Sequence, residues 1–259
     1  MTGLQQRWRA SAGWNGLALA LVCVLAAWSM WWAEFRWDNL SKSGPRFFEF
    51  FSRLTPPDWS VTRLLINSTF ETLMITLAGT FVAVIVALPV GFLAASNVSP
   101  SWVSMPLKAV LGVVRSVPLI LAGLLFVSAL GLGAFPGALA IAFHSVGMLG
   151  KFYAEEFETA DKGIINAVQG TGATWLQTVR FGLLPQCIPQ LVAFTVYRFE
   201  MNFRDATILG IVGAGGIGFY ISMYIGSFQY QKVAVLLILI VGVVLVLDQL
   251  TYWVRRWIR

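Results

Sequence analysis

The chain concentrates polar and charged side chains inside one of its apolar stretches. Five of them fall within residues 197–205: Arg198, Glu200, Asn202, Arg204 and Asp205. At about 100° per residue, Arg198, Asn202 and Asp205 share one face of a helix, and Glu200 and Arg204 share the opposite face. A guanidinium group offers forked donors that match tetrahedral oxyanions, and charged groups in a membrane face a pathway or one another. We therefore expect an anion to pass along this segment.

Arg198 and Arg204 are the main candidates for contacts with that anion. Arg198 shares its face with other polar groups, including Asn202, which favours a pathway role. Glu200 stands four residues before Arg204, the favourable order for an ion pair, so this pair is either purely architectural or also part of the pathway. Counted from a span that begins at Pro185, at a rise of about 1.5 Å per residue, the cluster is expected in the outer half of the membrane.

Two further side chains are weaker pathway candidates. Arg115 lies three residues before Pro118, whose ring should kink a helix, and it either snorkels toward the interface or faces a polar pathway. His144 is followed by Ser145, but adjacent helical residues do not face one another and no Gly-x-Ser-x-Gly elbow occurs. A serine hydrolase is therefore not indicated. One histidine and two cysteines predict neither a metal site nor a disulfide framework.

Nucleotide binding is not predicted for this chain. It lacks the Gly-Lys-Ser/Thr of a P-loop, so ATP and Mg²⁺ would have to be bound by another chain. Residues 213–218 match a dinucleotide pattern, but no β-α-β unit surrounds them. We expect residues 205–221 to form a re-entrant or broken helix of the kind that builds transport sites, with close helix packing through small residues as the alternative. The glycines concerned are Gly210, Gly213, Gly215, Gly216 and Gly218.

Membrane helices must position these side chains. Of the 259 residues, 58% are hydrophobic and 12% are charged, the mean hydropathy is +0.75, and a soluble domain carries about a quarter charged residues. A helix needs about 20 apolar residues to cross a bilayer. We therefore predict an all-α polytopic membrane protein and not a barrel. The six expected spans are Trp14–Ala33, Phe70–Ala95, Pro106–Gly131, Ala134–Tyr153, Pro185–Phe203 and Val233–Trp253.

Basic residues predict the orientation of these spans. Arg7 and Arg9 near the start, and Arg255, Arg256 and Arg259 near the end, place both termini in the cytoplasm. The first span is expected to be a retained anchor and not a signal peptide, because its apolar run is long and no small-x-small site ends it. The net charge of +6 is attributed to inner loops and anionic lipid, not to nucleic acid.

Residues 34–69 are expected outside the membrane, where Phe47, Phe50, Phe51 and Leu54 recur at the spacing of a short interfacial helix. Tryptophans are expected to mark both interfaces. The outer group is Trp28, Trp31, Trp32 and Trp37, and the inner group is Trp8, Trp14, Trp253 and Trp257.

Residues 155–185 are mostly polar and separate two apolar runs, so we expect them to form short cytoplasmic helices. Gly163 is predicted to end the first helix. A second should run from about Ile164 to an interruption at residues 170–172, and a third should cover Trp175–Arg180. Such short helices are marginal in water alone, so they must pack either on a soluble partner or on their own membrane domain.

This segment resembles the EAA loop of ABC-importer permeases, in which Glu-Ala-Ala is followed by three residues, Gly, nine residues, Ile, one residue and Leu-Pro. Four positions match at the correct spacing: Ala167, Gly172, Leu184 and Pro185. Asn166 stands in place of the glutamate, and Val168 and Gly182 replace an alanine and the isoleucine. The resemblance implies that this region contacts an ATPase. The expected coupling residues are Glu158, Asn166, Ala167, Gly172, Ala173, Leu184 and Pro185.

Beyond this loop, the chain is similar to the PhnE family of phosphonate-importer permeases. The similarity runs from about Phe70 to the C-terminus and is most specific over residues 144–218, which include Tyr197-Arg198-Phe199-Glu200 and the glycine-rich run. It implies a type I ABC-importer permease fold. The core would be residues 70–259, after an N-terminal helix (residues 1–33) and an outer loop (residues 34–69).

The same resemblance implies an assembly in the bacterial inner membrane. Its expected parts are a homodimer of this permease, two cytoplasmic ABC ATPase subunits and an extracytoplasmic binding protein that delivers phosphonate or a related phosphorus oxyanion. Phosphate and phosphite stay open as substrates. An ATP-independent anion transporter or channel is the alternative function.

Overall fold

The computed structural model describes the backbone of residues 3–34 and 37–258, and the side chains of residues 16, 18–34 and 43–257. All regular structure in these residues is helical, which confirms the predicted all-α class. The chain forms two compact units, Met1–Arg53 and Leu54–Arg259. Several residues used above to predict orientation lie outside the described side chains: Arg7, Trp8, Arg9, Trp14, Trp37 and Arg259.

The first unit contains α1 (Gly3–Trp32) and α2 (Trp37–Arg53). α1 includes most of the first predicted span. α2 is longer than the interfacial helix expected around residues 47–54, and its phenylalanines Phe47 and Phe51 are exposed. Leu54 was wrongly assigned to this helix: it lies beyond the last residue of α2 and is buried in a core cluster of the second unit.

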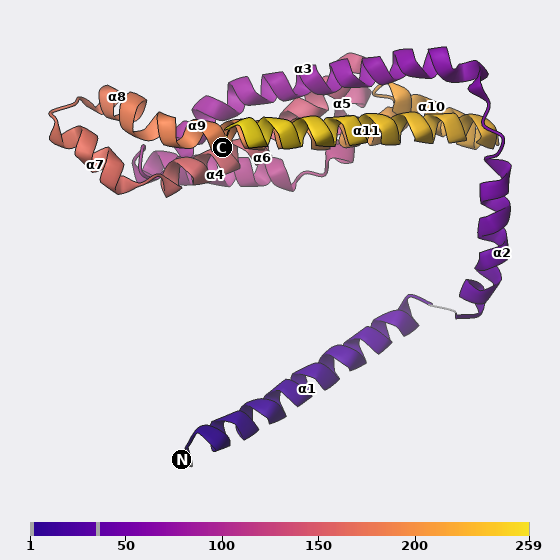
Figure 1. Ribbon diagram of the computed structural model, residues 1–259, viewed down its shortest axis with the longest axis horizontal. Coiled ribbons are helices and arrows are strands. Elements are labelled where there is room, and N and C mark those ends of the chain that lie inside the picture. Colours follow the sequence, from indigo (N-terminus) through magenta and orange to yellow (C-terminus); the bar gives the residue numbers. More distant parts are fainter. Residues whose placement is uncertain (1–2, 35–36, 259) are drawn as a thin grey trace. The chain divides into compact units, whose positions relative to one another are not determined.

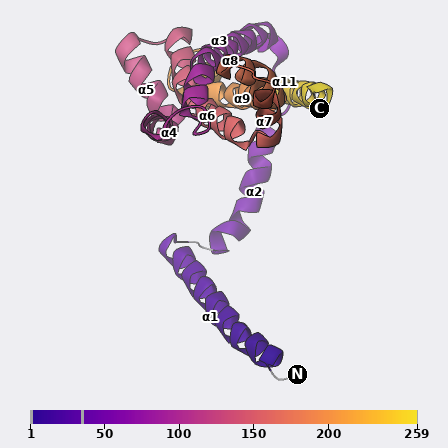
Figure 2. The ribbon, with the colours of Figure 1, turned by 90° about the vertical axis from the view of Figure 1, so that its left-hand side faces the viewer.

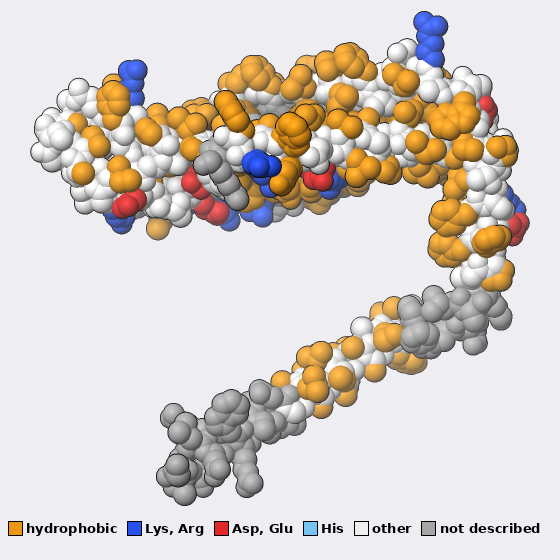
Figure 3. All heavy atoms as spheres, viewed as in Figure 1, with side chains coloured by type: hydrophobic (Ala, Val, Ile, Leu, Met, Phe, Trp, Pro, Cys, Tyr) orange, Lys and Arg blue, Asp and Glu red, His pale blue; other side chains and the backbone are white. Residues whose placement is uncertain are grey.

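The second unit is a helical bundle (Figures 1 and 2). Its elements are the short 3₁₀ helix Trp59–Val61, α3 (Thr62–Ala94), α4 (Ser101–Ser116), α5 (Leu119–Leu130), α6 (Ala134–Thr159), α7 (Lys162–Gly170), α8 (Trp175–Thr178), a π turn at Val179–Leu183, α9 (Leu184–Ile211), α10 (Ile217–Gly226) and α11 (Tyr230–Ile258). Hydrophobic side chains cover much of its visible surface, as expected for contact with lipid or partner helices (Figure 3).

α6 lies at the centre of this bundle and contacts α3, α4, α5 and α9. Glycines on α3 allow a close approach of α3 to α6. A Cβ atom on Gly79 would lie 2.8 Å from the carbonyl oxygen of Ala138, and one on Gly91 would lie 2.8 Å from that of Gly150. Small residues at a membrane helix interface let two backbones approach and gain van der Waals contact. α9 in turn contacts α3, α10 and α11.

Three helices among the described residues are long and apolar enough to cross a membrane: Trp59–Ala94, Trp175–Ile211 and Tyr230–Trp257. The pair α4–α5 adds a fourth span if it is counted as one. Two of the six predicted spans are therefore not among the helices that are long and apolar enough to cross a membrane. The described apolar part of α1, Ala18–Trp32, is short, and α6 carries His144 and Lys151 among its apolar residues.

The predicted kink at Pro118 is a full break. α4 ends at Ser116, α5 begins at Leu119, and the two helices are bent by 83°. The proline has no N–H to donate and its ring displaces the preceding turn, and the residue before a proline avoids the helical region. Val117 accordingly adopts an extended conformation.

Helix boundaries at the cytoplasmic end differ from the prediction. α6 continues to Thr159, so Glu155 and Glu158 belong to its last turns and not to a separate helix. Gly163 does not end a helix but lies in the first turn of α7. Asp161 caps this helix by accepting a hydrogen bond from the Gly163 N–H at 2.7 Å. Sequence reasoning missed this cap because glycine was given more weight than the preceding aspartate.

The predicted third cytoplasmic helix is the start of the fifth span. α8, the π turn and α9 form one 37-residue helix, Trp175–Ile211. Pro185 lies in the first turn of α9 and lacks the N–H that an α-helical bond to Phe181 would need. The wider π turn just before it lets the helix continue.

We expect Gly79→Ala to destabilise the bundle, because its Cβ would meet the α6 backbone at 2.8 Å and overpacking costs about 1–3 kcal/mol. Gly112→Ala is the matched control, since no atom lies within 4 Å of its Cβ position in α4. Thermal unfolding of the detergent-solubilised protein should show a lower Tm for Gly79→Ala and an unchanged or higher Tm for Gly112→Ala. Equal Tm values would contradict the close approach of α3 and α6.

Candidate functional site

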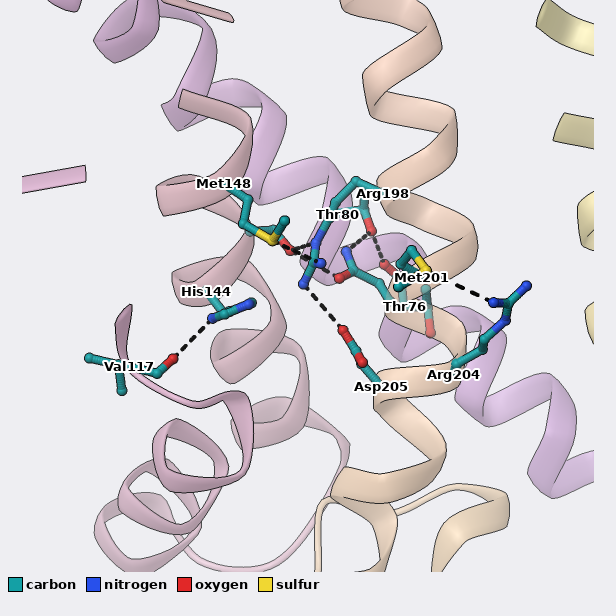
Figure 4. A network of polar contacts seen from close by, with 11 residues as sticks. Thr76, Thr80, Val117, His144, Met148, Arg198, Met201, Arg204 and Asp205 are labelled. Carbon is teal, nitrogen blue, oxygen red and sulfur yellow. Dashed lines mark hydrogen bonds and ion pairs between the residues drawn. The ribbon is translucent and has the colours of Figure 1, made fainter. Parts of the chain in front are cut away.

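A buried polar network crosses the centre of the bundle (Figure 4). Arg198 on α9 is only 4% exposed. Its Nε–H donates to the Ser145 hydroxyl of α6 at 3.1 Å, and one terminal nitrogen pairs with Asp205 at 3.2 Å. The other terminal nitrogen lies 3.1 Å from the sulfur of Met148. Each guanidinium nitrogen therefore has an acceptor, as burial of a charge requires.

Asn202 extends this network to α3. Its amide N–H donates to the Thr80 hydroxyl at 2.8 Å, and its oxygen accepts from Ser145 at 3.1 Å. Asn202 and Ser145 are both fully buried. Thr80 in turn donates to the carbonyl oxygen of Thr76, one turn back in α3. The network thus joins α3, α6 and α9 through side chains.

The second predicted face of α9 is separate from this network. Glu200 is buried and accepts from Arg204, whose side chain is 45% exposed. The two residues line a groove against α11. The structure therefore brings Arg198, Asn202 and Asp205 together and holds Glu200 and Arg204 apart from them.

The position of this cluster along the bundle can be described relative to α11. Arg255, near the end of α11, lies over the Tyr197 ring at 5.2 Å from its centroid, so the start of the cluster is level with the end of α11. α7, α8 and the start of α9 extend beyond the end of α11 (Figure 1). The depth of the cluster in the membrane stays a prediction.

His144 and Arg115 are not bonded to the network. His144 Nδ1 lies 3.1 Å from the carbonyl oxygen of Val117, at the break between α4 and α5. This contact satisfies a carbonyl group that the broken helix leaves without an intrahelical partner. The Arg115 guanidinium lies over the Phe152 ring, 5.6 Å from its centroid. In Figure 4 the His144 ring lies between Val117 and the Arg198 side chain.

The glycine-rich segment contains a break at residues 212–216, between α9 and α10. Three glycines there have positive φ: Gly213, Gly215 and Gly216. A Cβ on Gly216 would lie 2.3 Å from the Thr72 hydroxyl oxygen, which accepts a hydrogen bond from the Ile217 N–H at 2.8 Å. Gly210 and Gly218 pack closely against each other, since a Cβ on Gly210 would lie 2.6 Å from the Cα of Gly218. The segment therefore combines a helix break with close packing.

α7 and α8 lie at one end of the bundle (Figures 1 and 2). Asn166, Ala167 and Gly172 are exposed, Ala173 is half-buried, and Gly172 has a φ of +81° that ends the turn after α7. Thr174 and Gln177 form a capping box at the start of α8. Large apolar side chains are exposed beside them: Ile164, Trp175, Leu176 and Phe181.

Glu158 faces into the chain and not outward. Its carboxylate accepts from the Ser96 N–H at 2.6 Å and pairs with Lys108 of α4. Asn97 donates to the carbonyl oxygen of the adjacent Phe157 at 2.6 Å. Burial raises the pKa of Glu158, but the hydrogen bonds from Lys108 and Ser96 outweigh burial, so its pKa lies below the ordinary value. Glu158 therefore fixes the last turn of α6, just before α7, to the α3–α4 connection.

Leu184 and Pro185 sit at the junction of the π turn and α9. Gln186, the next residue, accepts from the Asp161 N–H at 2.9 Å. The matching Leu-Pro of the EAA-like loop thus lies beside the cap of α7. Sequence reasoning missed Thr80, Lys108, Ser96 and Asn97, because each meets its partner about 50 or more positions away in the chain.

We expect Thr80→Val to destabilise the bundle, because it leaves the buried Asn202 amide without an acceptor, at a cost of about 1–3 kcal/mol. Thr76→Val is the matched control, since that hydroxyl bonds only to the carbonyl oxygen of Thr72 in its own helix. Thermal unfolding in detergent should give a Tm several degrees lower for Thr80→Val than for Thr76→Val. A larger loss for Thr76→Val would argue against the link between α3 and α9.

Comparison with known proteins identifies this arrangement. Residues 87–259 match the family model described as binding-protein-dependent transport system inner membrane component. The phosphite transport system permease protein PtxC of Stutzerimonas stutzeri is 42% identical over 202 residues, covering 78% of this chain and 74% of that protein. The phosphate-import permease protein PhnE of Mycolicibacterium smegmatis is 36% identical over 210 residues, covering 79% of this chain and 39% of that protein.

The fold is also found among solved structures. The inward-facing MetNI methionine ABC transporter contains a chain that superposes with a TM-score of 0.69 at 23% identity, covering 78% of this chain and 99% of that one. The family match covers the π turn, the α6 and α9 members of the polar network, the glycine-rich break and the exposed helices α7 and α8. This chain therefore belongs to the family of binding-protein-dependent transport system inner membrane components, the permease subunits of ABC importers.

Proposed function

We propose that this chain is the permease of an importer for a phosphorus oxyanion, with phosphonate, phosphite and phosphate as the candidate substrates. The observation that carries the proposal is the similarity, over more than three quarters of the chain, to permeases named for phosphite and phosphate import. The aligned region holds an arginine in a polar network, and a guanidinium group suits tetrahedral oxyanions. The resemblance to phosphonate-importer permeases adds phosphonate to the class.

The working assembly is proposed to be a homodimer of this permease with two cytoplasmic ABC ATPases and an extracytoplasmic binding protein. One EAA-like loop per chain supports two permease copies, because two ATPases need two docking loops. Both termini would lie in the cytoplasm of a bacterial cell. The binding protein would make most of the substrate selection.

The docking surface for the ATPase is proposed to be α7 and α8. The exposed polar residue Asn166 and the exposed Ala167 occur together with exposed large apolar side chains, including Leu176, which is 69% exposed. A mixed surface of this kind is typical of a protein interface. Glu158 contributes as a positioning residue, because its contacts hold the end of α6 that leads into α7.

Transport is proposed to follow rigid-body alternating access. ATP-driven closure of the ATPase dimer would move α7 and α8, and their movement would reach the network through α6 and α9, which both end in the docking region. The helix breaks at Val117–Pro118 and residues 212–216 supply places where the bundle can bend. Arg198 would meet the anion when the pathway opens, with His144 beside it at the first of these breaks.

Arg198→Ala should reduce ATP-dependent uptake of phosphite or phosphate at least tenfold in proteoliposomes that contain the full complex. The removal of Arg198 also leaves Asp205 unpaired, so the double variant Arg198→Gln/Asp205→Asn serves as the control for architecture. If Arg198 contacts the anion, the double variant should show no recovery of uptake, although its Tm should return toward that of the unmodified complex. Restored uptake in the double variant would show that the ion pair is only structural, and ATP-independent uptake by the permease alone would contradict the importer.

Gly172→Leu should raise the number of ATP molecules hydrolysed per anion transported several-fold. The φ of +81° at Gly172 costs other residues about 1–2 kcal/mol, so the turn between α7 and α8 should shift on its ATPase. Gly170→Leu is the matched control, because Gly170 lies in α7 with no atom within 4 Å of its Cβ position. The measurement compares ATPase activity with uptake in the same proteoliposomes, and equal ratios for both variants would contradict docking through this turn.

A further inference from the structure

We propose that the groove between α9 and α11 is a binding site for a phosphate-class oxyanion held by Arg255. The groove has a volume of about 530 Å³ and is lined by Tyr197, Glu200 and Arg204 of α9 and by Asp248 and Arg255 of α11. A second cavity of about 470 Å³ shares Tyr197 and Arg255 with it. Arg255 therefore stands where the two cavities meet.

Arg255 differs from the other two arginines of this region, because no hydrogen bond or ion pair to it is found among the described residues. Arg198 pairs with Asp205, and Arg204 pairs with Glu200. The Nε of Arg255 is enclosed by protein and has no partner among those residues. The donors that a ligand in the groove can reach are therefore the two terminal nitrogens, and a guanidinium group without an acceptor favours a bound partner.

The guanidinium of Arg255 is also held in place. It lies over the ring of Tyr197, 5.2 Å from the centroid, so one face of its plane is covered by an aromatic ring. Its N–H donors point outward in that plane, where they form a fork that matches two oxygens of a tetrahedral oxyanion. A lysine at this position could not offer the same geometry.

The carboxylates of the groove would repel a fully deprotonated oxyanion, so they suit a ligand that keeps a proton on one oxygen. Asp248 lies two turns before Arg255 on the same helix, about 10 Å away by the rise of an α-helix, and it makes no ion pair among the described residues. It is available to accept a hydrogen bond from a protonated oxygen of the ligand. The groove thus offers a cation at one end and acceptors at the other.

Two sources can supply such a group. Arg255 lies near Trp253 and Trp257, which are exposed, and charged side chains of both signs lie among hydrophobic ones where α11 ends (Figure 3). This level suits a lipid headgroup at an aromatic belt. A free phosphorus oxyanion on its way through the protein is the second source. Only the second source rests on the function proposed above.

The test measures thermal stabilisation of the purified permease–ATPase complex in detergent. One arm titrates dioleoyl phosphatidic acid against dioleoylglycerol, which has the same chains without the phosphate. The other arm titrates inorganic phosphate against sodium chloride at equal ionic strength. Ligand binding raises Tm in proportion to the logarithm of ligand concentration over Kd, so each arm gives an apparent Kd.

Arg255→Gln should raise the apparent Kd at least tenfold in one arm or in both, and Arg256→Gln should behave as the unmodified complex. Arg256 is a matched control, because it lies next to Arg255 but lines a different pocket, with Trp253 and Trp257. Loss confined to phosphatidic acid identifies a lipid headgroup, and loss confined to inorganic phosphate identifies transported anion. Failure of the function proposed above would leave the phosphatidic acid arm intact.

Arg255→Lys keeps the positive charge. It replaces Arg255→Gln as the test variant if Arg255→Gln does not assemble with the ATPase. It should also weaken binding, because an ammonium group lacks the fork. The proposal is overturned if neither probe stabilises the unmodified complex. It is equally overturned if the Arg255 variants match Arg256→Gln in both arms.

Discussion

The burial of one guanidinium group constrains the centre of this bundle. A charged side chain away from water needs an acceptor for each donor, and Arg198 finds them on α6 and on its own helix. Ser145 accepts from Arg198 and donates its own proton to the Asn202 oxygen, and the Asn202 amide in turn donates to Thr80 of α3. One buried charge therefore fixes the relative register of three helices. A network of this kind is stable only when all its members are satisfied.

α6 connects this network to the end of the bundle that carries α7 and α8. The middle of α6 carries Ser145. The nearby Gly147 lets α4 approach, since a Cβ on Gly147 would lie 2.7 Å from the backbone nitrogen of Arg115. The last turn of α6 carries Glu158, which is held by Lys108 and the Ser96 N–H. The same helix thus provides an acceptor for the buried arginine and an anchored last turn that leads into α7. Small residues and one ion pair together make α3, α4 and α6 a single packed unit.

The sequence predicted those features that depend on local periodicity. The shared face of Arg198, Asn202 and Asp205 follows from helical geometry, and the glycine-rich break follows from the weakness of glycine in a helix. Partners distant in the chain could not be predicted, because nothing local connects Thr80 with Asn202 or Lys108 with Glu158. The continuation of α9 back to Trp175 was missed because a proline and a glycine predict a helix end. A π turn resolves that conflict, and such a turn has no clear sequence signature.

The uninterrupted helix Trp175–Ile211 has a mechanical consequence. Its 37 residues span about 55 Å at 1.5 Å per residue. It begins at Trp175 of the exposed tip, carries Arg198 and ends at the glycine-rich break. A rigid rod of this length acts as a lever arm: a tilt of about 5° at its base displaces its far end by about 5 Å. That displacement is close to the width of a small oxyanion. Motion imposed at the tip can thus reach the centre of the protein without crossing a flexible loop.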